Sequence, residues 1–167
     1  KNTKISIYDV PCHTSGHVLY YLTDNNDKYP SLVTGDTLFV GGVGHFFEGT
    51  AKQMLDNFKK IAKFPKETKL YVGHEYALSN YAFGIFIEPN NEKLKERYEY
   101  ATKQKKEGGL CTPSTIEIEM ESNVFMRTDQ KSVQNGLKKY YNEAVQKNVI
   151  DKVPARFAVN IDKNTTK

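Results

Sequence analysis

Three residues of the metal-ligand type lie in the first half of the chain. His13 lies in the segment Pro-Cys-His-Thr-Ser-Gly-His, Asp36 lies in Thr-Gly-Asp-Thr, and His74 lies in Val-Gly-His-Glu. Imidazole and carboxylate groups are the usual protein ligands of hydrolytic zinc and iron sites. Each residue follows a short apolar segment of strand type, and loops at strand ends commonly build active sites. The pattern therefore predicts a metallohydrolase centre.

Each residue taken alone also has a simpler interpretation. A single histidine is more often structural than a ligand, and Asp36 in Gly-Asp-Thr would suit an Asx turn. His13 and His17 are spaced like a helical pair of zinc ligands, but Gly16 and the strand that follows argue against a helix. We expect His13 to bind metal and His17 to support the site through a hydrogen bond. Three such placements between residues 13 and 74 favour the functional interpretation.

The elements around these residues have the patterns of strands and one helix. Strand patterns occur at residues 4–10, 18–22, 31–34 and 69–72. Thr50 and Gln53 have the spacing of a capping box, which predicts a helix that Pro65 terminates. Strand, glycine-rich loop, helix and strand in succession predict an α/β layered unit.

The second half of the chain has the pattern of helices. Helical patterns cover residues 76–87, 91–106 and 132–147, and Gly108-Gly109 closes the second of them. Ser114 and Glu117 have the spacing of a second capping box. We therefore expect a change from the layered unit to a helical one near residues 75–90.

Composition limits the classes of function. The 167 residues are enough for one hydrophobic core. The net charge of +4 comes with lysines interspersed among acidic residues, so we expect no nucleic-acid partner. The sequence has no run of about 18 apolar residues, so we expect no membrane-spanning helix. The first residues also lack an apolar segment of signal-peptide length. Two cysteines, Cys12 and Cys111, are too few for a disulfide framework and favour a reducing compartment.

A glycine-rich loop covers residues 39–49. Its Gly-x-x-Gly spacing is compatible with phosphate binding, but it lacks the Lys-Ser/Thr of a P-loop and the dinucleotide fingerprint. We interpret these glycines as allowing the backbone to pass close to a metal-bound substrate.

Together these residues resemble glyoxalase II, the hydroxyacylglutathione hydrolases of the metallo-β-lactamase superfamily. The resemblance covers roughly residues 5–135, including 11–17, 35–50, 73–76 with Asn80, 87–91, 112–115 and 123–127. It implies an α/β fold: the C-terminal half of a metallo-β-lactamase-like αββα sandwich, followed by a small α-helical domain. The implied domains are a partial metallo-β-lactamase-like domain at residues 1–75 and a helical substrate-binding domain at residues 76–167.

The resemblance also implies roles for individual residues. His13 would ligate one metal, His74 would ligate the second, and Asp36 would bridge both as the catalytic carboxylate. The cofactors would be two divalent ions, with zinc expected first and iron or manganese as alternatives. A metal-bound hydroxide would hydrolyse S-(2-hydroxyacyl)glutathione, such as S-lactoylglutathione, to a 2-hydroxy acid and glutathione. The expected substrate-binding residues are His45, Phe47, Tyr76 and Asn80, and the expected compartment is the cytoplasm or the mitochondrion.

Three departures from the family pattern separate the competing hypotheses. The His-x-His-x-Asp-His motif that normally lies upstream is absent, so we expect the two-metal site to be incomplete in this chain alone. His45 and Phe47 stand where the family usually has Lys and Tyr, which weakens the expected contact with the glycine carboxylate of glutathione. The usual basic Arg-x-x-Lys clamp has no clear equivalent in residues 153–167.

These departures leave alternatives beside the thioesterase. A missing N-terminal half, or a protein partner, would cover the exposed edge of the half-sheet. A catalytically inactive subunit or scaffold in a larger assembly is the second hypothesis. A persulfide dioxygenase with a single iron is the third, but the helical domain and Phe125-Met126-Arg127 argue against it.

Overall fold

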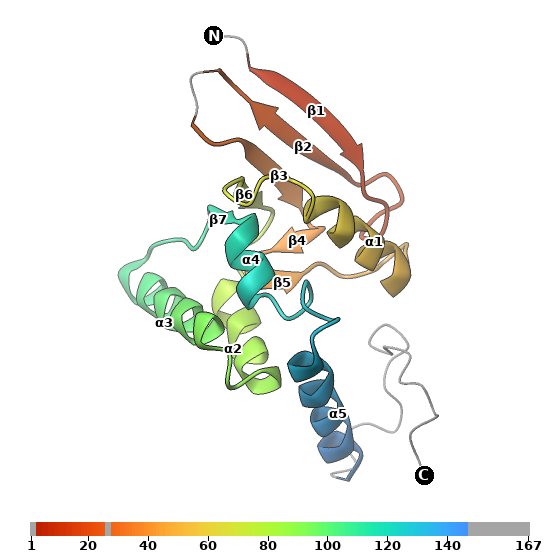
Figure 1. The fold of residues 1–167 in the computed structure, drawn as a ribbon, viewed down its shortest axis with the longest axis vertical. Helices are drawn as coiled ribbons and strands as arrows, with labels where there is room; N and C mark the ends of the chain where they lie inside the picture. The colour runs from red at the N-terminus through yellow and green to blue at the C-terminus, as the bar shows by residue number, and fades with distance from the viewer. Residues whose placement is uncertain (1–2, 26–27, 147–167) are drawn as a thin grey trace.

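The computed structural model describes residues 3–25 and 28–146. Within them, a five-stranded sheet has the order β1-β2-β3-β6-β7, and a short hairpin, β4–β5, lies beside it (Figure 1). Neighbouring strands are antiparallel except for β3 and β6, which are parallel. The strands are β1 Lys4–Asp9, β2 Val18–Thr23, β3 Ser31–Gly35, β4 Leu38–Phe39, β5 Gly42–Val43, β6 Lys69–Val72 and β7 Ser114–Thr115.

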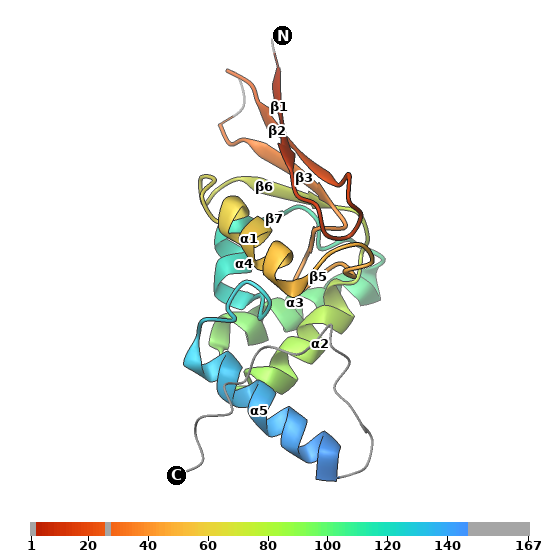
Figure 2. The same cartoon turned by 90° about the vertical axis from the view of Figure 1, so that its right-hand side faces the viewer.

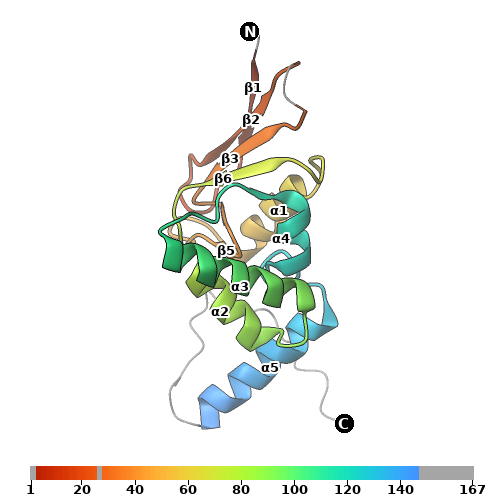
Figure 3. The ribbon, with the colours of Figure 1, turned by 90° about the vertical axis from the view of Figure 1, so that its left-hand side faces the viewer.

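Five helices accompany the sheet in the described part of the chain. Helices α1 and α4 lie against one side of the sheet, while α2, α3 and α5 lie at the end of the molecule away from β1 (Figures 2 and 3). The helices are α1 Ala51–Ile61, α2 Ala77–Ile87, α3 Glu92–Glu107, α4 Ile116–Ser122 and α5 Lys131–Gln146. None of the described helices is both long and apolar enough to cross a membrane.

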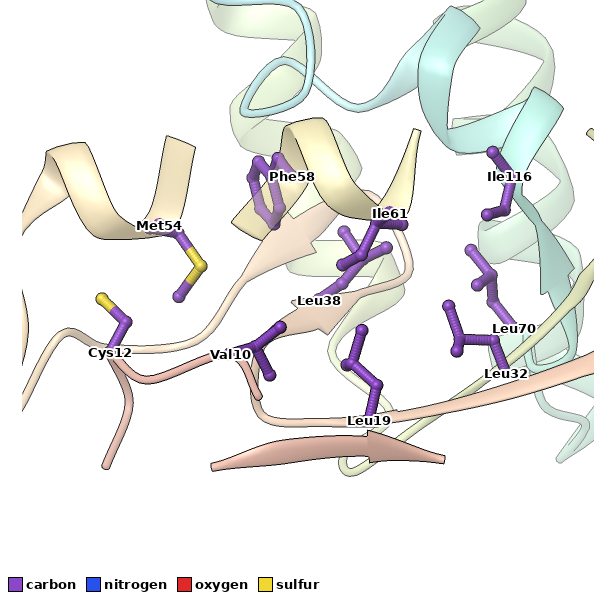
Figure 4. Close-up of a cluster of buried hydrophobic side chains, with 10 residues drawn as sticks. All are labelled: Val10, Cys12, Leu19, Leu32, Leu38, Met54, Phe58, Ile61, Leu70 and Ile116. Carbon is purple, nitrogen blue, oxygen red and sulfur yellow. The ribbon is translucent and has the colours of Figure 1, made fainter. Parts of the chain in front are cut away.

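One face of the sheet is packed. Alternating strand residues point toward α1 and α4, because successive side chains of a strand lie on opposite faces. The buried residues of the resulting core face one another between the sheet and the helices (Figure 4). They are Val10, Cys12, Leu19, Leu32, Leu38, Met54, Phe58, Ile61, Leu70 and Ile116.

The opposite face of the sheet is apolar but uncovered. Register places Ile7 opposite Tyr20, Tyr20 opposite Val33, and Val33 opposite Tyr71, so the side chains form a stripe across four strands. Their exposed fractions are 62% for Ile7, 44% for Tyr20, 38% for Val33 and 40% for Tyr71. We call these four residues together with Ile5, which is 57% exposed, the open sheet face.

A second core forms where α2, α3 and α5 meet the β4–β5 hairpin. Tyr81, Leu94 and Ala101 are buried there, with Val124 from the segment after α4 and Val133 from α5 itself. Strand β7 pairs with β6, and Ile116 of α4 belongs to the sheet core, so the chain returns to the sheet after α3. The predicted division into residues 1–75 and 76–167 stays a prediction. Strand β7 and helix α4 link the second of these segments to the sheet of the first.

The helix ends test the capping predictions. Thr50 and Gln53 make the predicted capping box of α1, and Gly108 ends α3 in the left-handed conformation with φ +69°. The capping box predicted at Ser114 and Glu117 is wrong. Ser114 is still extended because it pairs with Leu70 in the sheet, so α4 starts one residue later, and Thr115 is its N-cap.

A buried ion pair joins the helices. Arg127 donates to both oxygens of Glu88, at 3.1 and 2.8 Å, and Glu88 also accepts from Asn91 and Ser132. Burial alone would raise the pKa of Glu88, but these hydrogen bonds and the charge of Arg127 hold it below its usual value. The end of α2, the start of α3 and the start of α5 are therefore held at one carboxylate.

Candidate active site

The three predicted ligands lie at the same end of the sheet. Strands β3 and β6 are parallel, with Gly35 opposite Val72, so Asp36 and His74 follow the same ends of adjacent strands. Strand β1 runs in the direction of β3, since both are antiparallel to the β2 strand between them. The loop after β1, which carries His13, therefore lies at the same end of the sheet as Asp36 and His74.

Asp36 is the meeting point of the two histidines. Its Oδ2 atom lies 3.3 Å from Nε2 of His13 and 3.3 Å from Nε2 of His74. The side chains of His13 and Asp36 are 17% and 22% exposed, whereas His74 is 50% exposed. Ligand atoms about 2.05 Å from a tetrahedral zinc lie roughly 3.3 Å from one another. The observed separations suit ligands that share a cation, with Asp36 between two sites.

The hydrogen bonding of His13 supports a cation beside Asp36. Nδ1 of His13 lies 2.9 Å from the backbone oxygen of His45, which can only accept, so Nδ1 carries a proton. In neutral imidazole Nε2 is then an acceptor, and it faces the carboxylate oxygen of Asp36. Two acceptors at this distance repel unless a proton or a cation lies between them. Metal-binding histidines are commonly fixed in this way through their other nitrogen.

The His17 ring contacts the backbone of Asp36. The N–H of Asp36 donates to Nε2 of His17 at 3.1 Å, so this nitrogen is occupied. The contact matches the expected support function, while the assignment of His13 rather than His17 as ligand stays a prediction. Gly35, which precedes Asp36, has φ +50°, and a Cβ there would stand 2.8 Å from Nε2 of His17.

Glycine is also required at residue 73. A Cβ on Gly73 would overlap with Oδ1 of the Asp36 carboxylate. The N–H of Gly73 donates to the oxygen of Gly35 at 3.0 Å and holds the two strand ends together. The close approach of Asp36 and His74 therefore depends on the absence of a side chain between them.

Glu48 supports the His13 loop and was missed in the sequence. Its Oε2 atom accepts from the N–H of Ser15 at 2.5 Å. These hydrogen bonds from Ser15, with the nearby His13, lower the pKa of Glu48. The carboxylate thus stays ionised at neutral pH and holds the loop that presents His13.

Aromatic side chains surround the three residues. Tyr76 stacks on His74 with a centroid separation of 5.1 Å, and Phe39 stands edge-on to both rings. Phe47 lies 5.1 Å from the His13 ring and 5.5 Å from the His45 ring. Phe47 and Tyr76 are 71% and 50% exposed, so both can meet a ligand.

The predicted substrate contacts are distributed unevenly. His45, Phe47 and Tyr76 lie beside the three converging residues, through the ring and backbone contacts described above. The Nδ2 atom of Asn80 instead donates to the backbone oxygen of Val40 at 3.0 Å. The substrate-binding roles of all four residues stay predictions.

Two further residues near the site were also missed in the sequence. Glu119 and Asn123 hydrogen-bond to the backbone of the β4–β5 hairpin, which begins two residues after Asp36. Burial raises the pKa of Glu119, and hydrogen bonds from Ser114, Gly41 and Asn123 oppose that rise. Ile116, Glu119 and Asn123 follow helical spacing, so a carboxylate on the apolar side of a helix was the available signal.

The donor set fits part of a metal centre. Two imidazoles and one carboxylate are suitable ligands for zinc, iron or manganese, and their separations suit shared cations. In the described part of the chain, no group of three or more His, Cys, Asp and Glu side chains has the arrangement to hold a metal ion by itself. Three donors, with one shared, would give each metal only two protein bonds, which is fewer than the usual three or four. The residues fit as one side of a site that needs further ligands.

Comparison with known proteins gives a consistent family. A family profile described as "Hydroxyacylglutathione hydrolase C-terminus" matches residues 75–153. The cytoplasmic hydroxyacylglutathione hydrolase of Arabidopsis thaliana is 44% identical over 128 residues, which are 76% of this chain and 50% of that protein. The hydroxyacylglutathione hydrolase of Pseudomonas aeruginosa (strain LESB58) is 42% identical over 127 residues, 76% of this chain and 48% of that protein. The chain thus spans about half the length of the curated relatives it matches.

A solved structure gives the fold class. The metallo-beta-lactamase from Staphylococcus aureus subsp. aureus COL superposes with a TM-score of 0.54 at 21% identity, over 92% of this chain and 36% of that chain. The similarity shows the fold alone. Together the matches confirm the family and the metallo-β-lactamase-like α/β fold expected from the sequence.

Proposed function

We propose, from the premise that the chain belongs to the hydroxyacylglutathione hydrolase (glyoxalase II) family, that it contributes one side of a two-metal thioesterase centre. The reaction would be hydrolysis of S-(2-hydroxyacyl)glutathione to a 2-hydroxy acid and glutathione. The observation that carries the proposal is the convergence of His13 and His74 on one oxygen of Asp36. The name of the Arabidopsis relative favours the cytoplasm among the two expected compartments.

In this proposal His13, Asp36 and His74 hold two divalent metal ions. When bound, such ions lower the pKa of water and stabilise negative charge on the thioester oxygen. The backbone oxygen of His45 keeps the Nδ1 proton of His13 in place, so that Nε2 remains available as a ligand. His17 fixes the backbone of Asp36.

The leaving group needs little help from the protein. A thiol with a pKa of about 8.5 departs as a thiolate without a strong general acid. Tyr76 and Phe47 present exposed rings on two sides of the ligands and would pack against the substrate. His45 and Asn80 would contribute polar contacts, with residues 1–75 binding metal and residues 76–167 binding substrate.

The remaining ligands would come from a second sheet on the open sheet face. The stripe from Ile7 to Tyr71 is apolar across four strands, and two-layer folds bury such faces against another layer. The curated relatives are about twice as long as their matched region, which is enough chain for such a layer. The layer would belong either to the same polypeptide or to a partner.

A fusion experiment tests the function. The chain would be joined to the half of the Arabidopsis relative that it does not match, supplied with Zn²⁺, and assayed with S-lactoylglutathione. We expect turnover that Asp36→Ala lowers at least about 100-fold, since that change removes the group between the metals. A folded, zinc-loaded fusion without turnover would contradict the proposal and favour the inactive-subunit hypothesis.

A further inference from the structure

The β4–β5 hairpin joins two parts of the candidate site. It covers Leu38–Phe39 and Gly42–Val43, between Asp36 on one side and His45 on the other. Asp36 meets both histidine ligands, and the His45 oxygen holds the ring of His13. The separation of these two contacts therefore depends on the conformation of the hairpin.

Side chains of the helical segments hold the hairpin at four consecutive residues. Asn123 donates to the oxygen of Gly42 at 3.0 Å and lies 3.4 Å from that of Phe39. The N–H of Gly41 donates to Oε2 of Glu119 at 2.8 Å. The oxygen of Val40 accepts from Asn80 at 3.0 Å. The turn of the hairpin is thus bound by side chains and not only by its own short ladder.

The turn also lies flush against α2. Gly41 has φ +67°, and a Cβ there would stand 2.7 Å from the Tyr81 ring. A Cβ on Gly42 would overlap with the side-chain amide of Asn80. The turn therefore has little freedom to move toward α2, and its hydrogen bonds fix it in the other directions.

Glu119 is the central group of this arrangement. It is fully buried, with 0% exposure, and its hydrogen bonds go to Gly41, Ser114 and Asn123 and not to the candidate ligands. Its Oε2 accepts from Gly41 and, at 2.9 Å, from Asn123, while its Oε1 accepts from Ser114 at 2.6 Å. It therefore ties β7 and α4 to the hairpin through one carboxyl group.

We propose that Glu119 is a positioning residue of the active site, which sets the separation of Asp36 and His45 by holding the β4–β5 turn through Gly41 and Asn123. The inference rests on the proposed function for its catalytic consequence, but its structural part does not. Phe39 gives a second route to the site, because its ring backs both His74 and Tyr76.

The test compares the same substitution at two buried carboxylates. Glu119→Asp withdraws the carboxylate from the hairpin, and Glu88→Asp makes the same change in the Arg127 ion pair, which does not contact the hairpin. Glu119→Gln is the conservative variant, since its amide oxygen can still accept from Gly41. The readouts are amide hydrogen exchange at Gly41 and the NMR signals of the His13 and His74 rings at fixed pH.

We expect Glu119→Asp to raise exchange at Gly41 at least about tenfold, as for loss of a buried hydrogen bond, and to shift both histidine ring signals. Glu88→Asp should leave the ring signals in place, and Glu119→Gln should keep them close to the parent. Unchanged ring signals in Glu119→Asp, or equal shifts in Glu88→Asp, would overturn the proposal.

Catalysis in the fused thioesterase gives an independent readout. We expect Glu119→Asp to lower kcat about tenfold while KM changes less than about twofold, because misplaced catalytic groups act on the transition state. An unchanged kcat in an active fusion would also contradict the inference. If the fusion has no activity at all, the proposed function fails, but the NMR comparison still decides whether Glu119 positions these residues.

Discussion

The sheet and the helical segments complete their cores in different ways. The sheet buries one face under α1 and α4 and leaves the other face apolar and exposed. The helices α2, α3 and α5 surround a core of their own and are joined by the Glu88–Arg127 ion pair. The helical segments therefore carry their own stabilising contacts, whereas the sheet retains a surface suited to another layer.

Removing Arg127 should have the largest effect. Arg127→Ala leaves Glu88, which is 4% exposed, as a buried charge without its cation. Breaking such a pair costs about 3–5 kcal/mol in the free energy of unfolding. Urea denaturation at pH 7 measures it. A loss below about 1 kcal/mol would show that the ion pair is not what joins these helices.

Substitutions at Leu70 and Tyr71 compare the two faces of the sheet within one strand. Leu70 is fully buried and Tyr71 is 40% exposed. Leu70→Ala should cost about 3 kcal/mol, because it leaves a cavity under α1 and α4. Tyr71→Thr should cost less than about 1 kcal/mol, since threonine, like tyrosine, is favoured in strands and the face is uncovered. Equal losses in parallel denaturation curves would mean that both faces are packed.

The ion pair should also give a dependence on pH. The pKa of Glu88 is lowered from 4.5 in the folded state, so its contribution is present above that value and is lost as pH falls through the folded pKa. The stability difference between the parent and Glu88→Gln should therefore shrink below about pH 4.5. Denaturation at pH 7 and at steps down to pH 3 measures this difference. A difference that stays constant would contradict the ionised state of Glu88.

The smallest expected effect concerns Ile7 on the open sheet face. Ile7→Thr should change the unfolding free energy by no more than about 0.5 kcal/mol in the chain alone. In the fusion used for the thioesterase test, Ile7→Lys should destabilise strongly, because the second layer would bury the charge. If Ile7→Lys were as harmless in the fusion as in the chain alone, the open sheet face would not be the contact surface.

The elements that local patterns define were predicted well. The strands at residues 18–22 and 69–72 and the cap at Thr50 occur as expected, because alternation and capping are properties of adjacent residues. Strand β7 and the β4–β5 hairpin were not predicted. Their two-residue strands form only through pairing and through side chains that arrive from distant helices.

The candidate site was also predictable only in part from the sequence. The types and order of His13, Asp36 and His74 were visible in the sequence, whereas their convergence depends on β3 lying beside β6 across a long connection. Glu119 was missed because a carboxylate in a charged sequence suggests a solvated face. Only the fold shows that it is buried beneath the hairpin.

Gly73 gives a means of separating ligand chemistry from ligand placement. A single methyl group there would occupy the space of the Asp36 carboxylate while leaving every donor atom in the sequence unchanged. Gly73→Ala would thus produce a chain with a complete list of ligands and no room to gather them. Family searches that score only the ligands would still accept such a chain, so residue 73 is worth inspecting before a relative is judged competent to bind metal.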